Sequence, residues 1–95
     1  MRKDLRVEHD TDRHRFVAQL PEGDAVVVYR DEGGGTLDLL HTEVPAAVEG
    51  SGVASALVHG VVAHARAENL RLRATCPYVK TWLRRHAAEG DVFVS

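Results

Sequence analysis

The sequence predicts an α+β fold in which helices pack on one mixed, mostly antiparallel sheet. Three observations lead to this prediction. Before residue 45, short segments of alternating or β-branched residues are separated by turn signals. From Val53 to Glu68, apolar residues recur with the period of a helix. A further alternating segment, a second helical segment and a short final strand follow, so the expected order is ββββ-α-β-α-β.

Four predicted strands, joined by short turns, form an antiparallel meander. The third strand, from Ala25 to Tyr29, is almost continuously β-branched and is expected to be central in the sheet. Pro45 ends the fourth strand, because proline has no N–H group to donate to a ladder. The expected strands span residues 5–9, 14–20, 25–29 and 36–44.

The first helix connects the fourth strand to a fifth at residues 70–76. Asn69 is expected to end this helix in the left-handed conformation. A strand, a helix and a strand in this order favour a right-handed crossover, so the two strands should be parallel. The apolar stripe of the helix consists of Ala54, Leu57, Val58, Val61, Val62 and Ala65.

The second helix is expected to begin at Pro77, whose fixed φ suits the first helical position. Gly90 ends the helix, and residues 91–94 form the last strand. A chain of 95 residues suffices for one core, so residues 1–95 are predicted to be a single domain. The expected inner stripe of the second helix consists of Tyr78, Val79, Trp82, Leu83 and His86.

Composition narrows the classes of function. With 12 Lys and Arg against 14 Asp and Glu, the net charge of −2 gives no electrostatic case for nucleic acid or an anionic membrane. No apolar run approaches the roughly 20 residues that span a bilayer. The single cysteine, Cys76, cannot form an internal disulfide, so a cytoplasmic location is expected. The histidines show no tight metal spacing, and no metal is expected.

A glycine-flanked turn at the start of the first helix is the candidate binding element. Its first N–H groups have no helical partner and lie at the positive end of the helix dipole, where a phosphate group fits. Gly50 and Gly52 lack the Cβ atoms that would keep a phosphate away from the backbone. The alternative is a tight strand-to-helix connection that binds nothing. The nucleotide-triphosphate motif Gly-Lys-Ser/Thr is missing, and a meander does not suit a dinucleotide fold.

Three motifs together resemble the GCN5-related N-acetyltransferases, in particular their small, minimal acetyltransferase-like subfamily. They are His41-Thr42-Glu43-Val44-Pro45, Gly50-Ser51-Gly52-Val53-Ala54 and Cys76-Pro77-Tyr78-Val79. The resemblance covers about residues 7 to 90 and implies that the first helices of larger members are missing. The basic residue that usually opens the family's acyl-CoA signature is absent, since Ala47 and Glu49 stand there.

The resemblance implies an acetyl-CoA co-substrate held where the fourth and fifth strands splay apart. The pantetheine arm would run past Thr42, Glu43 and Val44, and Cys76 and Tyr78 would flank the thioester. One or two of the basic residues 71, 73, 80, 84 and 85 could meet the 3′-phosphate, the alternative being a solvated face. The pyrophosphate would lie on Gly50, Ser51, Gly52, Val53 and Ala54.

Four residues are candidates for catalysis. Cys76 could accept the acetyl group as a thiolate at a helix N-terminus, or be a small buried hydrophobe. His41, with an intrinsic pKa of about 6.5, or Glu43 on the same strand face could deprotonate the amine; a water or no base at all are the alternatives. Tyr78 could protonate the CoA thiolate, as a tyrosine often does in larger members, or fill the core.

The predicted function is therefore an acyl-CoA-dependent N-acetyltransferase that acts on an amine, with a protein or peptide amine among the options. The alternative is a CoA-binding module with little catalysis that acts as a sensor or interaction domain. The sequence does not identify the acceptor. A monomer or weak dimer is expected.

Overall fold

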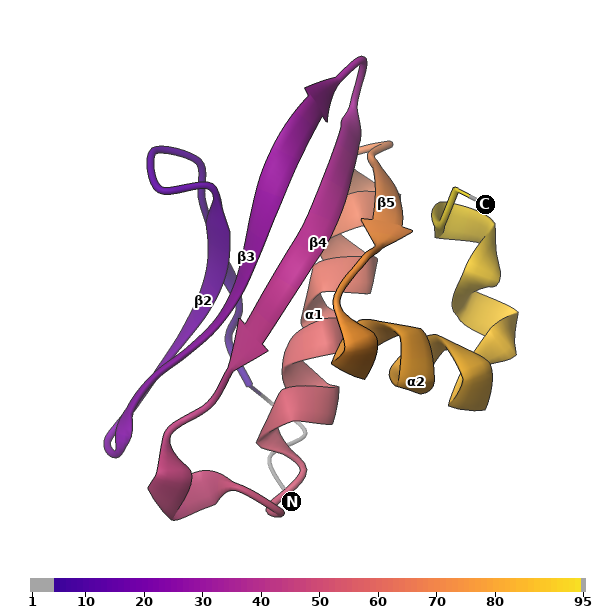
Figure 1. The fold of residues 1–95 in the computed structure, drawn as a ribbon. Helices are drawn as coiled ribbons and strands as arrows, with labels where there is room; N and C mark the ends of the chain where they lie inside the picture. Colours follow the sequence, from indigo (N-terminus) through magenta and orange to yellow (C-terminus); the bar gives the residue numbers. More distant parts are fainter. Residues whose placement is uncertain (1–4, 95) are drawn as a thin grey trace.

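The computed structural model describes residues 5–94 and contains one five-stranded sheet with helices packed on it (Figure 1). The strands lie in chain order, β1-β2-β3-β4-β5, and this confirms the predicted α+β class. Helix α1 lies behind the sheet, and α2 lies beyond β5 (Figure 1). The elements are β1 (Glu8–Asp10), β2 (Arg15–Leu20), β3 (Gly23–Gly33), β4 (Thr36–Glu43), α1 (Val53–Ala67), β5 (Arg71–Ala74) and α2 (Pro77–Arg85), with 3₁₀ helices at Ala46–Val48 and Ala87–Val92.

Strands β1 to β4 form the predicted antiparallel meander. The largest differences in bounds are that the first strand begins at Glu8 rather than Leu5, and that the third spans Gly23–Gly33 rather than residues 25–29. The other ends of these four strands differ from the prediction by at most one residue. The longer third strand follows from the hairpin to β4, which continues the pairing as far as Gly33 and Thr36. Within the described residues, no helix combines the length and apolar content needed to cross a membrane.

A bulge in β4 sets which side chains face which side of the sheet. Val28 pairs with His41 and Tyr29 with Leu39, so Leu40 is an extra residue in β4. A bulge of this kind locally disrupts the ladder and redirects the following side chains. Thr42, after the bulge, pairs with the fully buried Val27.

The parallel pairing of β4 and β5, predicted from the strand-helix-strand order, is confirmed, but it is short. It joins Thr36–Leu39 to Arg71–Ala74. Its last bonds run from the backbone N–H groups of Thr75 and Cys76 to the Leu39 carbonyl, at 3.2 and 2.8 Å. From Leu40 to Glu43, β4 continues without a β5 partner. Figure 1 shows β4 and the segment after β5 diverging there.

The predicted last strand at residues 91–94 is wrong. Residues Ala87–Val92 form a 3₁₀ helix, and only Phe93 bridges β5, at Leu72. The backbone N–H groups of Glu89 and Phe93 donate to carbonyls three residues earlier, at 2.9 and 3.0 Å. These local bonds use backbone groups that a strand would offer to the sheet.

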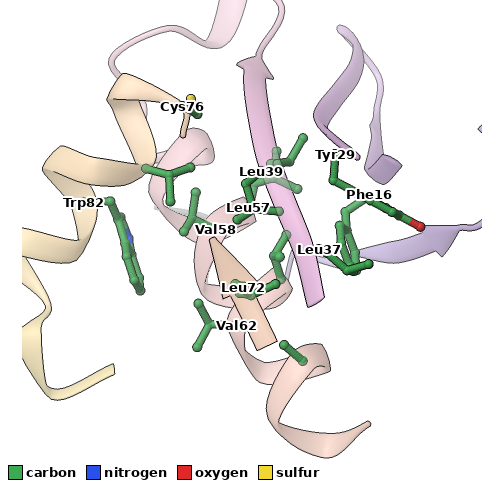
Figure 2. Close-up of a cluster of buried hydrophobic side chains, with 14 of the residues drawn as sticks. Phe16, Tyr29, Leu37, Leu39, Leu57, Val58, Val62, Leu72, Cys76 and Trp82 are labelled. Carbon is green, nitrogen blue, oxygen red and sulfur yellow. The ribbon is translucent and has the colours of Figure 1, made fainter. Parts of the chain in front are cut away.

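The core lies between α1 and one face of the sheet (Figure 2). Of the predicted α1 stripe, Ala54 is only half-buried, and Val53 is buried instead. In α2, Val79 and Trp82 are buried as expected, but Tyr78 is 38% exposed, so its assignment to the inner stripe is wrong. Trp82 is held by its indole N–H, which donates to Ser55 Oγ at 3.1 Å.

The chain just before β1, at Val7, packs against α1 at Gly60. A Cβ atom at Gly60 would lie 2.4 Å from Val7 Cγ2, a distance that real side chains do not adopt. Gly60 therefore allows the chain near Val7 to approach the helix closely.

His9 in β1 links three elements. Its Nδ1 lies 3.2 Å from His64 Nε2 on α1, its Nε2 lies 2.6 Å from the Tyr29 hydroxyl on β3, and its ring stacks on Phe16. Burial and the neighbouring His64 lower the pKa of His9, while Asp10 and Glu68 oppose that change. The folded protein therefore disfavours protonated His9 relative to the unfolded chain.

The free energy of unfolding should consequently fall as the pH drops through about 6.5, the ordinary pKa of histidine in an unfolded chain. Above that pH, His9 is neutral in both states, and its full contribution to the free energy of unfolding is present. In His9→Gln, an amide replaces the titrating ring, and the fall between pH 7.5 and about 5.5 should be smaller. Urea unfolding at several pH values measures this, and equal slopes for the two proteins would contradict it.

Candidate functional site

The turn into α1 leaves backbone donors free. Gly52, at φ 90°, caps the helix, and the first helical bond runs from the Ala56 N–H to the Gly52 carbonyl at 3.0 Å. The N–H groups of Val53, Ala54 and Ser55 precede that bond, and no side chain caps them. The Ser51 hydroxyl instead donates to the Val48 carbonyl at 2.5 Å. The sequence predicted this open N-terminus.

Both glycines of the turn face open space. A Cβ atom at Gly50 or Gly52 would meet nothing within 4 Å, and both residues have a positive φ, 80° and 90°. No acidic residue lies in the first turn of α1. An anion placed there would meet amides and the positive end of the helix dipole.

Cys76 lies where β4 and β5 separate. Its Sγ is 3.4 Å from the Thr42 hydroxyl, so these two side chains face each other across the separating strands. The residue is only 3% exposed and immediately precedes α2 (Figure 2). The thiol is thus buried next to the predicted pantetheine strand, in contact with Thr42.

Tyr78 lies in the first turn of α2, two residues after Cys76. Burial of part of its ring raises its pKa, against the opposing effects of Arg85 and a hydrogen bond with Ser55. The phenol is therefore protonated at neutral pH and has a proton to donate. Ser55 belongs to the first turn of α1, and its own N–H is one of the free amides.

His41 and Glu43 form an exposed pair. His41 Nε2 lies 3.0 Å from Glu43 Oε2, and the side chains are 61% and 64% exposed. The predicted shared face is confirmed. These residues pair with Val28 and Val26, whereas Thr42 pairs with the core residue Val27. His41 and Glu43 therefore lie on the sheet face opposite to Thr42 and Cys76, so the structure does not gather the four candidates at one point.

Asp38 is a residue of this region to which the sequence reasoning assigned no role. It is 3% exposed, and its carboxylate accepts hydrogen bonds from the Thr75 hydroxyl at 2.5 Å and from Arg30 at 3.2 Å. These bonds join β3, β4 and the end of β5 just before the strands separate. An aspartate between two leucines of a central strand was the available signal, because a buried charge requires partners.

A family model described as GCN5-related N-acetyl-transferase matches residues 15–92. Protein NATD1 of Xenopus tropicalis is 36% identical over 84 residues, which cover 86% of this chain and 77% of that protein. Protein NATD1 of Homo sapiens is 34% identical, with 86% and 74% covered. The solution structure of a GCN5-like protein from Staphylococcus aureus is 28% identical, with a TM-score of 0.72 over 97% of this chain and 90% of that one.

The contact between Thr42 and Cys76 predicts how the thiol reacts. Thr42→Ala removes the hydroxyl group that contacts Sγ and shortens the neighbouring side chain, so alkylation by iodoacetamide should become several-fold faster. Thr36→Ala is the matched control, since Thr36 lies at the other end of the same strand. Mass spectrometry measures the rate at which Cys76 is alkylated in each variant. Equal rates for Thr42→Ala and Thr36→Ala would show that Thr42 does not shield the thiol.

Proposed function

Because this chain belongs to the GCN5-related N-acetyltransferase family, we propose that it transfers an acetyl group from acetyl-CoA to an amine. The observation that carries the proposal is the pair of open backbone elements at one end of the molecule. Free amides begin α1, and β4 continues past its last contact with β5. The first element suits a pyrophosphate, and the second offers backbone groups to an extended pantetheine arm.

The donor would be held mainly by backbone. Residues Gly50 to Ala54 would bind the pyrophosphate, and Thr42, Glu43 and Val44 would lie along the pantetheine arm. The absence of acidic residues in the first turn of α1 supports this use of the turn. The basic residue that usually opens the family's motif is replaced by neutral and acidic ones, so the amides carry the binding.

In the direct route, the amine nitrogen attacks the thioester carbonyl, and the carbon–sulfur bond breaks. The amine loses a proton to a base, and the leaving thiolate takes one from Tyr78. The exposed pair of His41 and Glu43 supplies the base, with the 3.0 Å contact orienting the imidazole. An acceptor would then approach from the open sheet face, where a large substrate such as a protein amine has room.

The covalent route, through an acetylated Cys76, would use the other face of the sheet. The thiol is buried there beside Thr42, away from His41. The burial of the thiol favours the direct route. The burial of the thiol also supports the second candidate, a CoA-binding module with little catalysis. Turnover of acetyl-CoA against a panel of amines and peptides, for the wild type and Cys76→Ala, tests both.

Gly52→Ala tests the donor site. The added Cβ points into open space that a pyrophosphate would fill, so CoA should bind at least about tenfold more weakly, as expected for one lost charge-assisted hydrogen bond. Gly33→Ala is the matched control, because Gly33 has φ 84° and similarly open surroundings far from the turn. Both variants carry comparable backbone strain.

Titration calorimetry gives the two affinities, and thermal unfolding gives the shared cost in stability. The proposal requires weaker CoA binding in Gly52→Ala alone. Equal CoA affinities for the two variants would remove the basis of the donor site.

His41→Gln tests the base. The amide retains hydrogen bonding to Glu43 but cannot take a proton, so turnover should fall at least about tenfold while CoA affinity stays nearly unchanged. Steady-state rates from pH 6 to about 9 measure this. Full activity across that range would make His41 structural and leave Glu43 or water as the base.

A further inference from the structure

Thr75 and Cys76, which end the parallel ladder, hold β4 on both faces of the sheet. Their backbone N–H groups donate to the Leu39 carbonyl at 3.2 and 2.8 Å. The Thr75 hydroxyl donates to Asp38 Oδ1 at 2.5 Å, and Cys76 Sγ lies 3.4 Å from the Thr42 hydroxyl. Asp38 precedes the core residue Leu39 and so lies on the opposite face, whereas Cys76 belongs to the core. The two side-chain contacts are therefore made on opposite faces of the sheet.

Both carboxylate oxygens of Asp38 have a partner. Oδ1 accepts the Thr75 hydroxyl, and Oδ2 accepts Arg30 of β3 at 3.2 Å. Arg73, which pairs with Asp38 in β5, binds Glu32 through contacts of 2.7 and 3.2 Å. Because Asp38 is 3% exposed, removal of the Thr75 hydroxyl would leave a buried oxygen without a partner, and such an oxygen is strongly disfavoured. The bond therefore holds Thr75 against β4.

A buried carboxylate is a costly means of joining two strands, because apolar side chains of similar volume often stabilise a fold as well or better. A hydrogen bond between two side chains instead selects one register, since it forms at one alignment of the strands. A shift of β5 by one residue would take the Thr75 hydroxyl away from Asp38 and turn Leu72 out of the core. The contact between Asp38 and Thr75 therefore specifies the residue at which the strands separate.

The proposed donor ends where this separation begins. With the pyrophosphate at the turn into α1, the pantetheine arm runs from Val44 back past Thr42. The thioester then lies toward the closed end of the gap, at Leu39 and Cys76. A displacement of about 1 Å at a reacting centre can lower a rate by about 100-fold. The point at which the strands separate thus decides how well the thioester is placed.

We propose that Asp38 and Thr75 are positioning residues for the donor: their hydrogen bond fixes the point of strand separation and so places the thioester without touching it. This inference rests on the proposed function. The two residues lie at the closed end of the gap, whereas the pyrophosphate turn, residues 50–54, lies beyond its open end. Loss of the bond should therefore displace the thioester and leave CoA affinity nearly unchanged.

Thr75→Val removes the hydroxyl and keeps the shape of the side chain, while Thr75→Ser keeps the hydroxyl. Thr36→Val is the matched control, because Thr36 begins the same ladder and makes no side-chain hydrogen bond among residues 5–94. Amide hydrogen exchange is measured first, without CoA. In Thr75→Val the amides of residues 75 and 76 should exchange at least about tenfold faster, as expected for one lost hydrogen bond, while those of α1 stay unchanged. Thr75→Ser and Thr36→Val should exchange like the wild type.

Acetyl-CoA labelled with ¹³C at its carbonyl then reports on the thioester. Binding to the wild type should move the carbonyl resonance away from its position in free acetyl-CoA, because the group is held in a fixed environment. In Thr75→Val the resonance should return toward the free position, and Thr75→Ser should restore the wild-type shift. Calorimetry should give nearly equal CoA affinities for all four proteins.

Four results would overturn the inference: unchanged exchange of residues 75 and 76 in Thr75→Val, faster exchange throughout that variant, equal effects of Thr75→Ser, or a bound carbonyl resonance that is the same in Thr75→Val and the wild type. In each of these cases CoA still binds, and the proposed donor site stands. A wild type that binds no CoA is a different result, because it overturns the proposed function and the positioning role together.

Discussion

The geometry of the candidate site depends on one carbonyl group. The Leu39 carbonyl accepts the N–H groups of both Thr75 and Cys76, and the parallel ladder ends there. Beyond it, the chain after β5 turns into α2 at Pro77, while β4 continues to Glu43. Because Leu39 is fully buried, this end of the ladder is fixed by the core.

Two further features fix what surrounds the separation. The bulge at Leu40 places His41 and Glu43 on the open face and Thr42 on the helix face. Asp38 holds Thr75 and Arg30 just before the ladder ends, and its burial makes these bonds costly to break. The same strand therefore presents a polar pair to solvent on one face and a shielded thiol contact on the other.

The sequence predicted the fold well because its strongest patterns match local physics. The period of α1, the turns of the meander and Pro77 each specify their element without distant partners. The last strand was predicted wrongly because its alternation competed with local 3₁₀ bonds after α2. The free amides at Gly52 could be predicted from glycine spacing, whereas the division of the candidates between two faces could not, because the bulge at Leu40 has no sequence signal.

Gly60 has a consequence for any attempt to stabilise this chain. Replacing a helical glycine by alanine ordinarily gains about 1 kcal/mol of helix propensity. Here the methyl group would occupy the space of Val7, so α1 gives up propensity to bring the preceding segment close. The gain becomes accessible only if residue 7 is shortened together with the change at residue 60. Positions 7 and 60 should therefore be varied as a pair in engineering.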